Sequence, residues 1–249
     1  MADILARRNQ LALVRFARSN LLVAFDYDGT LAPIVQVPDR ARMRATTRRL
    51  LRSVAERYPC MVISGRARAD LIRRLGDLPV VHVSGNHGLE PWAENERYVQ
   101  QVREWIAYLT PRLRFCQGVM IEDKVYSISI HYRGARDERQ ALQAIDDALQ
   151  GLRRAHRIGG KLVVNVVPVG APDKGVALER ARRLLACETA LYVGDDETDE
   201  NVFAAMGPRQ LLGVKVGPVG QDSRARYLLK HQRQIDSLLR RLIELRPER

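Results

Sequence analysis

The sequence predicts an α/β protein in which a parallel sheet is covered by helices on both faces and a second domain is inserted into the first. Short apolar runs alternate with helical patterns in residues 21–84 and again in residues 174–245. Between these stretches the pattern changes to short strands that follow each other directly. A chain of 249 residues, 46% of them hydrophobic, is long enough to bury a core and a smaller appended unit.

The first stretch alternates strands and helices. Apolar runs predict buried strands, and apolar residues three or four positions apart predict the helices between them. After a first helix near residues 3–18, the predicted elements are a strand over 21–25, a helix over 39–56, a strand over 60–63, a helix over 67–75 and a strand over 80–84. Strands connected through helices in this way lie parallel in one sheet.

The second stretch resumes this alternation after the insert. It contains a helix over 174–185, a strand over 191–193, a helix after Asp199, a strand over 212–216 and a helix over 232–245.

The insert has a different pattern. Strands over 119–121 and 127–132, joined by a polar turn, predict a hairpin, which is followed by a helix over 137–156, a break at Gly159-Gly160 and a strand over 162–167. Pro91 and residues 168–172 are the expected hinges. We therefore expect a core of residues 1–91 and 169–249 and an inserted domain of residues 92–168.

The charge balance raises the question of a nucleic-acid partner. There are 41 basic and 29 acidic residues, for a net charge of +12. The arginines fall at helical spacings among apolar residues, and no arginine-rich tail, zinc-finger spacing or aromatic RNA-binding signature accompanies them. We expect solvated helix faces and no nucleic-acid partner.

The cysteines and the apolar runs indicate the compartment. Cys60, Cys116 and Cys187 are far apart and form no C-x-x-C pair, so neither a disulfide framework nor a zinc site is predicted. The helix over 3–18 lacks a signal-peptide core, and no apolar run approaches the roughly 20 residues that span a bilayer. We expect a cytoplasmic protein with no membrane association.

Two carboxylates follow the first strand. Asp26 and Asp28 lie on the same side of an extended chain and lead into Gly29 and Thr30. Such close acids repel each other unless a cation lies between them, and Mg²⁺ prefers oxygen ligands. We expect Asp26 to be a nucleophile and metal ligand and Asp28 to transfer protons. The alternative is an ordinary capped turn.

The second strand ends in Ser64, Gly65 and Arg66. Main-chain N–H groups at the start of a helix attract anions, so we expect Ser64 to bind a phosphate oxygen. Alternatively, Ser64 is only a helix cap. Arg66 is expected to contact a substrate or to form a surface ion pair.

Two further motifs open helices in the second stretch. Lys174 occupies a first helical turn, where a cation is unfavourable, and it could neutralise charge on a transferring phosphoryl group. Residues 194–199 hold four carboxylates after a buried strand. We expect Asp195 to bind the metal directly, and Asp199 to orient Lys174 or a bound water from the second shell. A solvated surface lysine and an acidic helix start are the alternatives.

In this order, the motifs resemble the haloacid dehalogenase superfamily of phosphatases and, within it, the trehalose-6-phosphate phosphatases. The resemblance is carried by residues 26–30, 63–66, 85–90, 122–124, 131–133, 173–175 and 194–200. It implies a Rossmann-like core with an inserted α/β cap domain, and hydrolysis through an aspartyl-phosphate. It also implies that Asp28 gives its main-chain carbonyl to Mg²⁺, that Ser64 and Lys174 hold the phosphate, and that Asp195 completes the protein's share of the coordination.

The resemblance also implies a small-molecule substrate, a phosphorylated disaccharide. Glu122 and Lys124 would bind the distal sugar. The other expected substrate contacts are Gly29, Thr30, Gly65, Arg66, His87, His131, Arg133 and Asn165. Each of these residues could instead be an ordinary loop or strand residue.

Asn165 departs from the family pattern, in which a glutamate is usual at this position. An amide loses the charge-assisted bonds that a carboxylate makes to hydroxyls. Phosphates of glucosylglycerol, mannosylglycerate or sucrose are therefore alternative substrates. A polynucleotide end phosphatase and a silent sugar-phosphate binder are further alternatives. A monomer is the default expectation for the oligomeric state.

Overall fold

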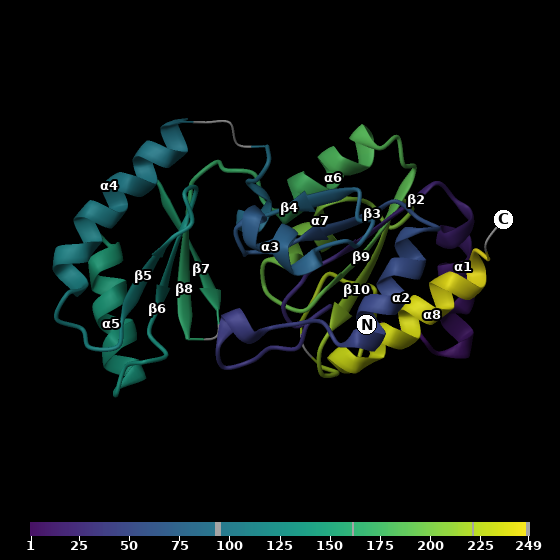
Figure 1. Ribbon diagram of the computed structural model, residues 1–249, viewed down its shortest axis with the longest axis horizontal. Helices are drawn as coiled ribbons and strands as arrows, with labels where there is room; N and C mark the ends of the chain where they lie inside the picture. Colours follow the sequence, from purple (N-terminus) through teal and green to yellow (C-terminus); the bar gives the residue numbers. More distant parts are fainter. Residues whose placement is uncertain (93–95, 161, 221, 248–249) are drawn as a thin grey trace. The chain divides into compact units, whose positions relative to one another are not determined.

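The chain divides into two compact units. The computed structural model describes residues 1–92, 96–160, 162–220 and 222–247. The first unit comprises Met1–Pro91 and Pro172–Arg249, and the second comprises Trp92–Ala171 (Figure 1). The second boundary follows Ala171 rather than Pro168, because the Tyr98 hydroxyl donates to the carbonyl of Gly170 and so ties this segment to the second unit.

A seven-stranded sheet forms the centre of the first unit. Its order is β1-β11-β10-β9-β2-β3-β4, and every neighbouring pair is parallel, as predicted. The strands are β1 (Ala2–Asp3), β2 (Leu21–Phe25), β3 (Cys60–Ile63), β4 (His82–Ser84), β9 (Thr189–Gly194), β10 (Leu211–Val216) and β11 (Tyr227–Leu229).

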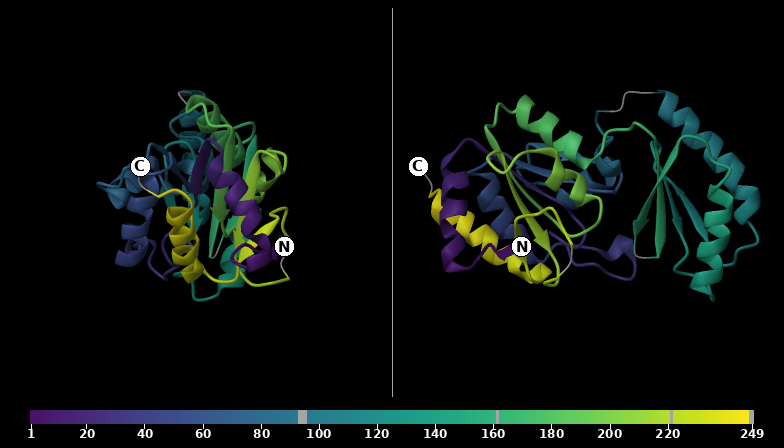
Figure 2. Two further views of the ribbon diagram at one scale, coloured as in Figure 1. Left: turned by 90° about the vertical axis from the view of Figure 1, so that its right-hand side faces the viewer. Right: turned by 180° about the vertical axis from the view of Figure 1, so that it is seen from behind.

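Helices cover both faces of this sheet. Side chains of α1 (Gln10–Arg18), α2 (Ala45–Ala55), α3 (Arg68–Leu75) and α8 (Ile235–Leu245) share one core cluster with alternate residues of the central strands. On the other face, Phe203 of α7 (Asp199–Ala205) meets the ring of Tyr192 edge-on, at 5.9 Å between centroids. Helix α6 (Lys174–Leu184) packs against α7. Figures 1 and 2 show these layers.

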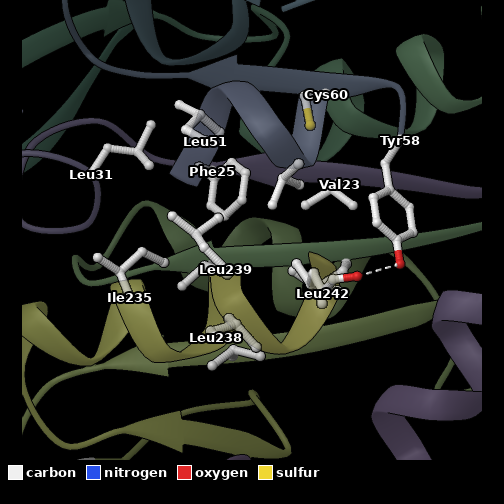
Figure 3. Close-up of a cluster of buried hydrophobic side chains, with 14 of the residues drawn as sticks. Val23, Phe25, Leu31, Leu51, Tyr58, Cys60, Ile235, Leu238, Leu239 and Leu242 are labelled. Atoms are coloured by element: carbon white, nitrogen blue, oxygen red, sulfur yellow. Dashed lines mark hydrogen bonds between the residues drawn. The ribbon is translucent and has the colours of Figure 1, made fainter. Parts of the chain in front are cut away.

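The core cluster explains why the central strands are apolar throughout. All five residues of β2 are buried, and two of them, Val23 and Phe25, pack with Leu51, Leu238 and Leu239 in the cluster of Figure 3. A strand that is buried on both faces has no position for a polar side chain. After β2 and β3, the polar residues Asp26 and Ser64 consequently lie just beyond the strand ends.

The second unit is a four-stranded antiparallel sheet with two helices on one face. Its order is β5-β6-β8-β7, and the predicted hairpin of β5 and β6 is confirmed. The elements are α4 (Glu96–Leu113), β5 (Met120–Asp123), β6 (Ile128–His131), α5 (Glu138–Leu149), β7 (Ala155–Gly160) and β8 (Val163–Pro168). Val102, Trp105, Ile128, Ile130 and Ile145 belong to the core between sheet and helices.

Some expected elements differ from the structure. The helix expected over 137–156 ends at Leu149, and residues 155–160 form β7 instead. Gly151 follows the end of this helix and lies against Tyr108, since a Cβ there would lie 1.9 Å from the Tyr108 hydroxyl. The helix expected over 39–56 begins only at Ala45, after the short 3₁₀ helix Pro38–Arg40.

Further short elements complete the chain. They are the 3₁₀ helices η1 (Arg7–Asn9), η3 (Asn86–Gly88) and η4 (Gln232–Gln234). None of the helices within the described residues is both long and apolar enough to cross a bilayer.

Candidate active site

Three neighbouring strands of the first unit deliver polar residues to one edge of the sheet. Strand β2 lies between β3 and β9, and its last residue, Phe25, is in register with residues of both neighbours. Asp26 follows β2, Ser64 follows β3 and Asp195 follows β9. Ligands of open parallel sheets bind at this carboxyl edge.

The turn after β2 holds Asp195 in place. Gly29 has a φ of +83°, and a Cβ at this position would lie 1.9 Å from Oδ2 of Asp195. The hydroxyl of Thr30 donates to Oδ1 of Asp195 at 3.0 Å. Glycine is therefore required for the carboxylate of Asp195 to lie against this turn.

Lys174 is a fully buried cation beside the expected nucleophile. Its Nζ donates to Oδ1 of Asp26 at 3.0 Å and to Oδ1 of Asp199 at 2.8 Å. Burial alone would lower the pKa of Lys174, but the carboxylates of Asp199 and Asp26 outweigh it and raise that pKa well above its ordinary value. Lys174 therefore keeps its positive charge.

Asp199 contacts Lys174, which is the arrangement expected of a group that orients it. Two further donors hold Asp199: the Tyr192 hydroxyl at 2.7 Å and the main-chain N–H of Asp196 at 2.9 Å. Tyr192 was not among the predicted site residues, because it lies within an apolar strand. The available clue was its hydroxyl, since a polar group in a buried run needs a hydrogen-bond partner.

The positive charge near the buried carboxylates of the site does not offset the cost of ionising all of them. Burial raises the pKa of Asp26 well above its ordinary value despite the nearby Lys174, and the neighbouring carboxylates add to this shift. Burial also raises the pKa of Asp195 to about 7, with Asp199 and Asp196 contributing. For Asp196, burial would raise the pKa, but Lys174 and hydrogen bonds lower it to about 2.

This donor set fits a magnesium ion. Asp26 and Asp195 offer hard oxygen donors, and their raised pKa values show that the site lacks positive charge. Among the described residues, no three His, Cys, Asp or Glu side chains already converge on one metal position. Mg²⁺ nevertheless keeps several waters and is usually bound by one or two carboxylates. Two carboxylates and a main-chain carbonyl therefore suffice.

The side chain of Asp28 does not share a cation with Asp26. Arg66 donates to both of its oxygens, from Nε at 2.6 Å and from Nη2 at 2.8 Å. Arg66 also donates from Nη1 to Asp70 at 3.0 Å. The two carboxylates of the motif thus each pair with a separate cation of the protein, whereas the sequence predicted one cation between them.

Ser64 is not the cap of the following helix. Helix α3 begins at Arg68, its N-cap is Ala67, and no side chain caps it. The Ser64 side chain is buried, and its Oγ accepts from the main-chain N–H of Arg66 at 3.3 Å. Its hydroxyl proton remains available for a phosphate oxygen.

His87 lies directly against the turn that follows Ser64. A Cβ on Gly65 would lie 2.5 Å from Cε1 of His87, and the imidazole is buried. A Cβ on Gly88 would likewise lie 2.3 Å from the carbonyl of Asp173, so the 85–90 turn packs against the start of α6. His87 therefore lies on a turn that packs beside the first residues of the helix that carries Lys174.

The remaining predicted residues lie in the second unit. The hairpin brings Glu122 and His131 together at 2.8 Å, with Nζ of Lys124 3.9 Å from Glu122. Asn165 is buried, and its Oδ1 accepts from the Ser129 hydroxyl at 2.5 Å.

The strand pairing of β5, β6 and β8 places three polar residues next to one another. Glu122 pairs with Ser129 across β5 and β6, and Ser129 pairs with Asn165 across β6 and β8, so the three form one row across the sheet. This row lies opposite the helices. Arg133 follows β6 in a turn.

Comparison with known proteins identifies the family. A family model described as trehalose-phosphatase matches residues 24–232. Trehalose-phosphate phosphatase B of Arabidopsis thaliana is 27% identical over 93% of this chain and 69% of its own length. Trehalose 6-phosphate phosphatase RA3 of Zea mays is 30% identical over 92% of this chain and 72% of its own.

Solved structures share the fold. The C-terminal domain of a Candida albicans trehalose-6-phosphate phosphatase superposes with a TM-score of 0.74 at 24% identity, covering 95% of this chain and 96% of that one. For an Aspergillus fumigatus trehalose-6-phosphate phosphatase the TM-score is 0.65 at 27% identity, with 98% and 99% covered. The match to the family model spans most of the chain, including every site motif described above, and the chain belongs to the trehalose-phosphatase family.

Proposed function

We propose that this protein hydrolyses trehalose 6-phosphate to trehalose and phosphate with Mg²⁺, through an aspartyl-phosphate formed on Asp26. One observation carries the proposal. The carboxylate of Asp26 is held by the buried Lys174 at the strand edge where Asp195 lies against Gly29. The family supports the same reaction class, phosphoric monoester hydrolysis.

In the first step Asp26 attacks phosphorus. Its Oδ1 accepts from Lys174, which fixes the carboxylate and leaves Oδ2 as the attacking atom. The bond from phosphorus to the sugar oxygen breaks, and Asp28 gives that oxygen a proton. Lys174 and Ser64 bind the phosphoryl oxygens, on which negative charge builds up.

In the second step water replaces the enzyme carboxylate. Asp28, now ionised, takes a proton from the water as the oxygen attacks phosphorus. The bond between Asp26 and phosphorus breaks, and inorganic phosphate leaves with Asp26 and Asp28 restored. The same side chain thus serves as acid and then as base.

Asp26, Asp195 and the main-chain carbonyl of Asp28 would hold the metal. When bound, Mg²⁺ supplies the positive charge that keeps the two carboxylates ionised and offsets the charge of the phosphate.

We propose that the second unit is the cap that recognises the sugar. Glu122, Lys124 and His131 form a polar cluster on the hairpin that can bind several hydroxyls. Oδ1 of Asn165 accepts from the Ser129 hydroxyl, and the other polar atom of this amide, Nδ2, can only donate. A substrate that places an acceptor there is favoured over one that needs an acceptor from the protein.

Because Asn165 is an amide and not a carboxylate, a second candidate within the same reaction class is the phosphate of glucosylglycerol, mannosylglycerate or sucrose. A panel of phosphate-release assays separates the candidates: these three esters, trehalose 6-phosphate, glucose 6-phosphate and a 3′-phosphorylated oligonucleotide. Highest kcat/KM on trehalose 6-phosphate supports the proposal, and highest kcat/KM on another ester replaces its substrate. Turnover of the oligonucleotide alone would indicate a polynucleotide end phosphatase.

Two controls test the chemistry. Asp26→Asn should abolish turnover while the protein stays folded by circular dichroism, and retained activity would remove Asp26 as nucleophile. Excess chelator should stop turnover, and Mg²⁺ should restore it. The cytoplasmic location and the monomeric state stay predictions.

A further inference from the structure

Lys215 is a buried lysine to which the proposed mechanism assigns no role. It lies on β10, in register with Gly194, the last residue of β9. Its side chain is only 7% exposed, and lysines are almost never buried so deeply unless they are paired. The contacts that Lys215 makes therefore have to explain its place in the sheet.

The ammonium of Lys215 reaches into the acidic motif that follows β9. Its Nζ donates to the main-chain carbonyl of Asp196 at 2.7 Å and lies 3.5 Å from Oε1 of Glu200 on α7. Asp196 directly follows Asp195 in the chain. Lys215 therefore fixes the main chain beside an expected metal ligand.

The other hydrogen bonds of Asp196 are local. Its main-chain N–H donates to Asp199 at 2.9 Å, and its carboxylate accepts from the main-chain N–H and the hydroxyl of Thr198, each at 2.6 Å. These bonds join residues within one turn. The bond from Lys215 instead attaches this turn to β10, a strand that pairs with β9 on one side and β11 on the other.

Glu200 supports the position of Lys215. It supplies the opposite charge, and both of its oxygens accept hydrogen bonds: Oε1 from the hydroxyl of Ser223 at 2.7 Å, and Oε2 from the main-chain N–H of Arg224 at 2.8 Å. Because the carboxylate is fixed at two points, it holds the ammonium near one position. Lys215 thus keeps its place against the carbonyl of Asp196.

The carboxylate of Asp195 is held from a different element. It accepts from the hydroxyl of Thr30 and lies against Gly29 in the turn after β2. Mg²⁺ tolerates little variation in the distance to its ligands, so both the side chain and the main chain of a ligand have to be held. Removing a group that orients a metal ligand typically weakens metal binding by roughly 10–100-fold.

We propose that Lys215 is a positioning residue for the metal site: its bond to the carbonyl of Asp196 holds the main chain so that the carboxylate of Asp195 faces the cation. The inference rests on the proposed function, because it takes Asp195 as a metal ligand. It adds a residue of β10, a strand that supplies none of the groups in the proposed mechanism.

The matched variants are Lys215→Met and Thr47→Val. Methionine has an unbranched side chain like that of lysine but lacks the donor, so the carbonyl of Asp196 loses its bond to β10. Thr47 on α2 is also buried, and its hydroxyl donates to Asp236 at 2.7 Å. Both substitutions remove a buried hydrogen bond, but Thr47 and Asp236 lie outside the proposed site.

The assay is the rise in Tm with Mg²⁺ concentration in the absence of substrate. A ligand that binds only the folded protein raises Tm by mass action, so this rise gives the Kd for Mg²⁺ without turnover. We expect this Kd to increase by about tenfold or more in Lys215→Met. In Thr47→Val it should stay within about twofold of the wild type, because the two sites share no partners.

An unchanged Kd for Mg²⁺ in folded Lys215→Met would overturn the proposal. An equal increase in Thr47→Val would also overturn it, since loss of stability alone would then explain both results. If Lys215→Met does not fold, Lys215→Gln carries the test. Its amide keeps a polar group in the site but ends one atom short of the ammonium. A Kd that increases about tenfold there supports the proposal, and an unchanged Kd contradicts it.

Failure of the proposed function is read from the wild type. If the Tm of the wild type does not respond to Mg²⁺, the metal assignment is wrong, and the role of Lys215 is wrong with it. If the wild type binds Mg²⁺ but releases no phosphate from trehalose 6-phosphate, the proposed substrate is wrong. The comparison of Kd values still decides the role of Lys215 in that case.

Discussion

The contact between Gly29 and Asp195 predicts a strong effect of a single methyl group. In Gly29→Ala the added Cβ would lie 1.9 Å from Oδ2 of Asp195. To reach ordinary van der Waals separation, the carboxylate has to move by about 1.5 Å. Mg²⁺ demands near-ideal ligand distances of about 2.0–2.1 Å, so a shift of this size removes Asp195 from the coordination sphere.

The substitution also strains the backbone, and this effect has to be separated from the collision. A side chain at the φ of Gly29, +83°, costs about 1–2 kcal/mol, equivalent to a loss of roughly 2–8 °C in Tm for a protein of this size. Gly220→Ala is the matched control. Gly220 has a φ of +98°, and a Cβ there would meet nothing within 4 Å.

The assay is the Mg²⁺ concentration that gives half-maximal phosphate release. We expect both variants to lose Tm through backbone strain, and Gly29→Ala to lose more because its Cβ also displaces Asp195. We also expect the half-maximal Mg²⁺ concentration to rise at least about tenfold in Gly29→Ala, because disturbed ligand orientation weakens metal binding by roughly this factor. In Gly220→Ala this concentration should stay unchanged. An unchanged Mg²⁺ requirement in a folded Gly29→Ala would refute the placement of the metal beside Asp195.

Three further predictions follow from the site and the hairpin. Tyr192→Phe removes a hydrogen-bond donor from the buried Asp199. It should lower the unfolding free energy, measured by urea denaturation, by about 1–3 kcal/mol. Unchanged stability would mean that Asp199 does not need this hydroxyl. Glu122→Ala removes a charged hydrogen-bond partner worth about 1.5–3 kcal/mol. It should reduce kcat/KM for the sugar phosphate roughly tenfold or more and leave kcat/KM for p-nitrophenyl phosphate unchanged. Equal losses on both substrates would contradict sugar recognition by the hairpin. The pKa of Asp195 is raised from 3.8 to about 7, so the folded protein keeps the Asp195 carboxyl protonated up to a higher pH than the unfolded chain does. The metal-free protein should therefore lose stability as the pH rises from 3.8 to about 7. Excess Mg²⁺ should reduce that loss in a thermal unfolding series, and stability that rises through this range would contradict the shift.

The sheet of the first unit could be predicted because its strands are buried on both faces. The expected strands over 21–25 and 60–63 coincide with β2 and β3, since continuous apolar runs leave little choice of boundary. Strand β7 was missed because its sequence, Ala155–Gly160, is largely exposed and ends in two glycines. It forms by pairing with β8, and such a tertiary contact leaves no periodicity in the chain.

The candidate site was predictable in its members but not in its pairings. Asp26, Ser64 and Asp195 follow strands, so topology alone brings them to one edge. The partners of Arg66 depend on how α3 packs, because Asp70 reaches it from the first turn of that helix. Tyr192 and Asp199 meet across a strand end and a helix start, which a one-dimensional pattern cannot show.

The proposed mechanism gives two carboxylates one residue apart different roles, and the structure gives them different surroundings. Asp26 is 4% exposed and pairs with a lysine that is itself sealed from water, so its partner cannot leave and its position is fixed, as a nucleophile requires. The Asp28 side chain is 34% exposed and pairs with an arginine that has a second anchor. The proposed mechanism needs a fixed carboxylate for nucleophilic attack and a more accessible one for proton transfer, and the surroundings of Asp26 and Asp28 differ in this way.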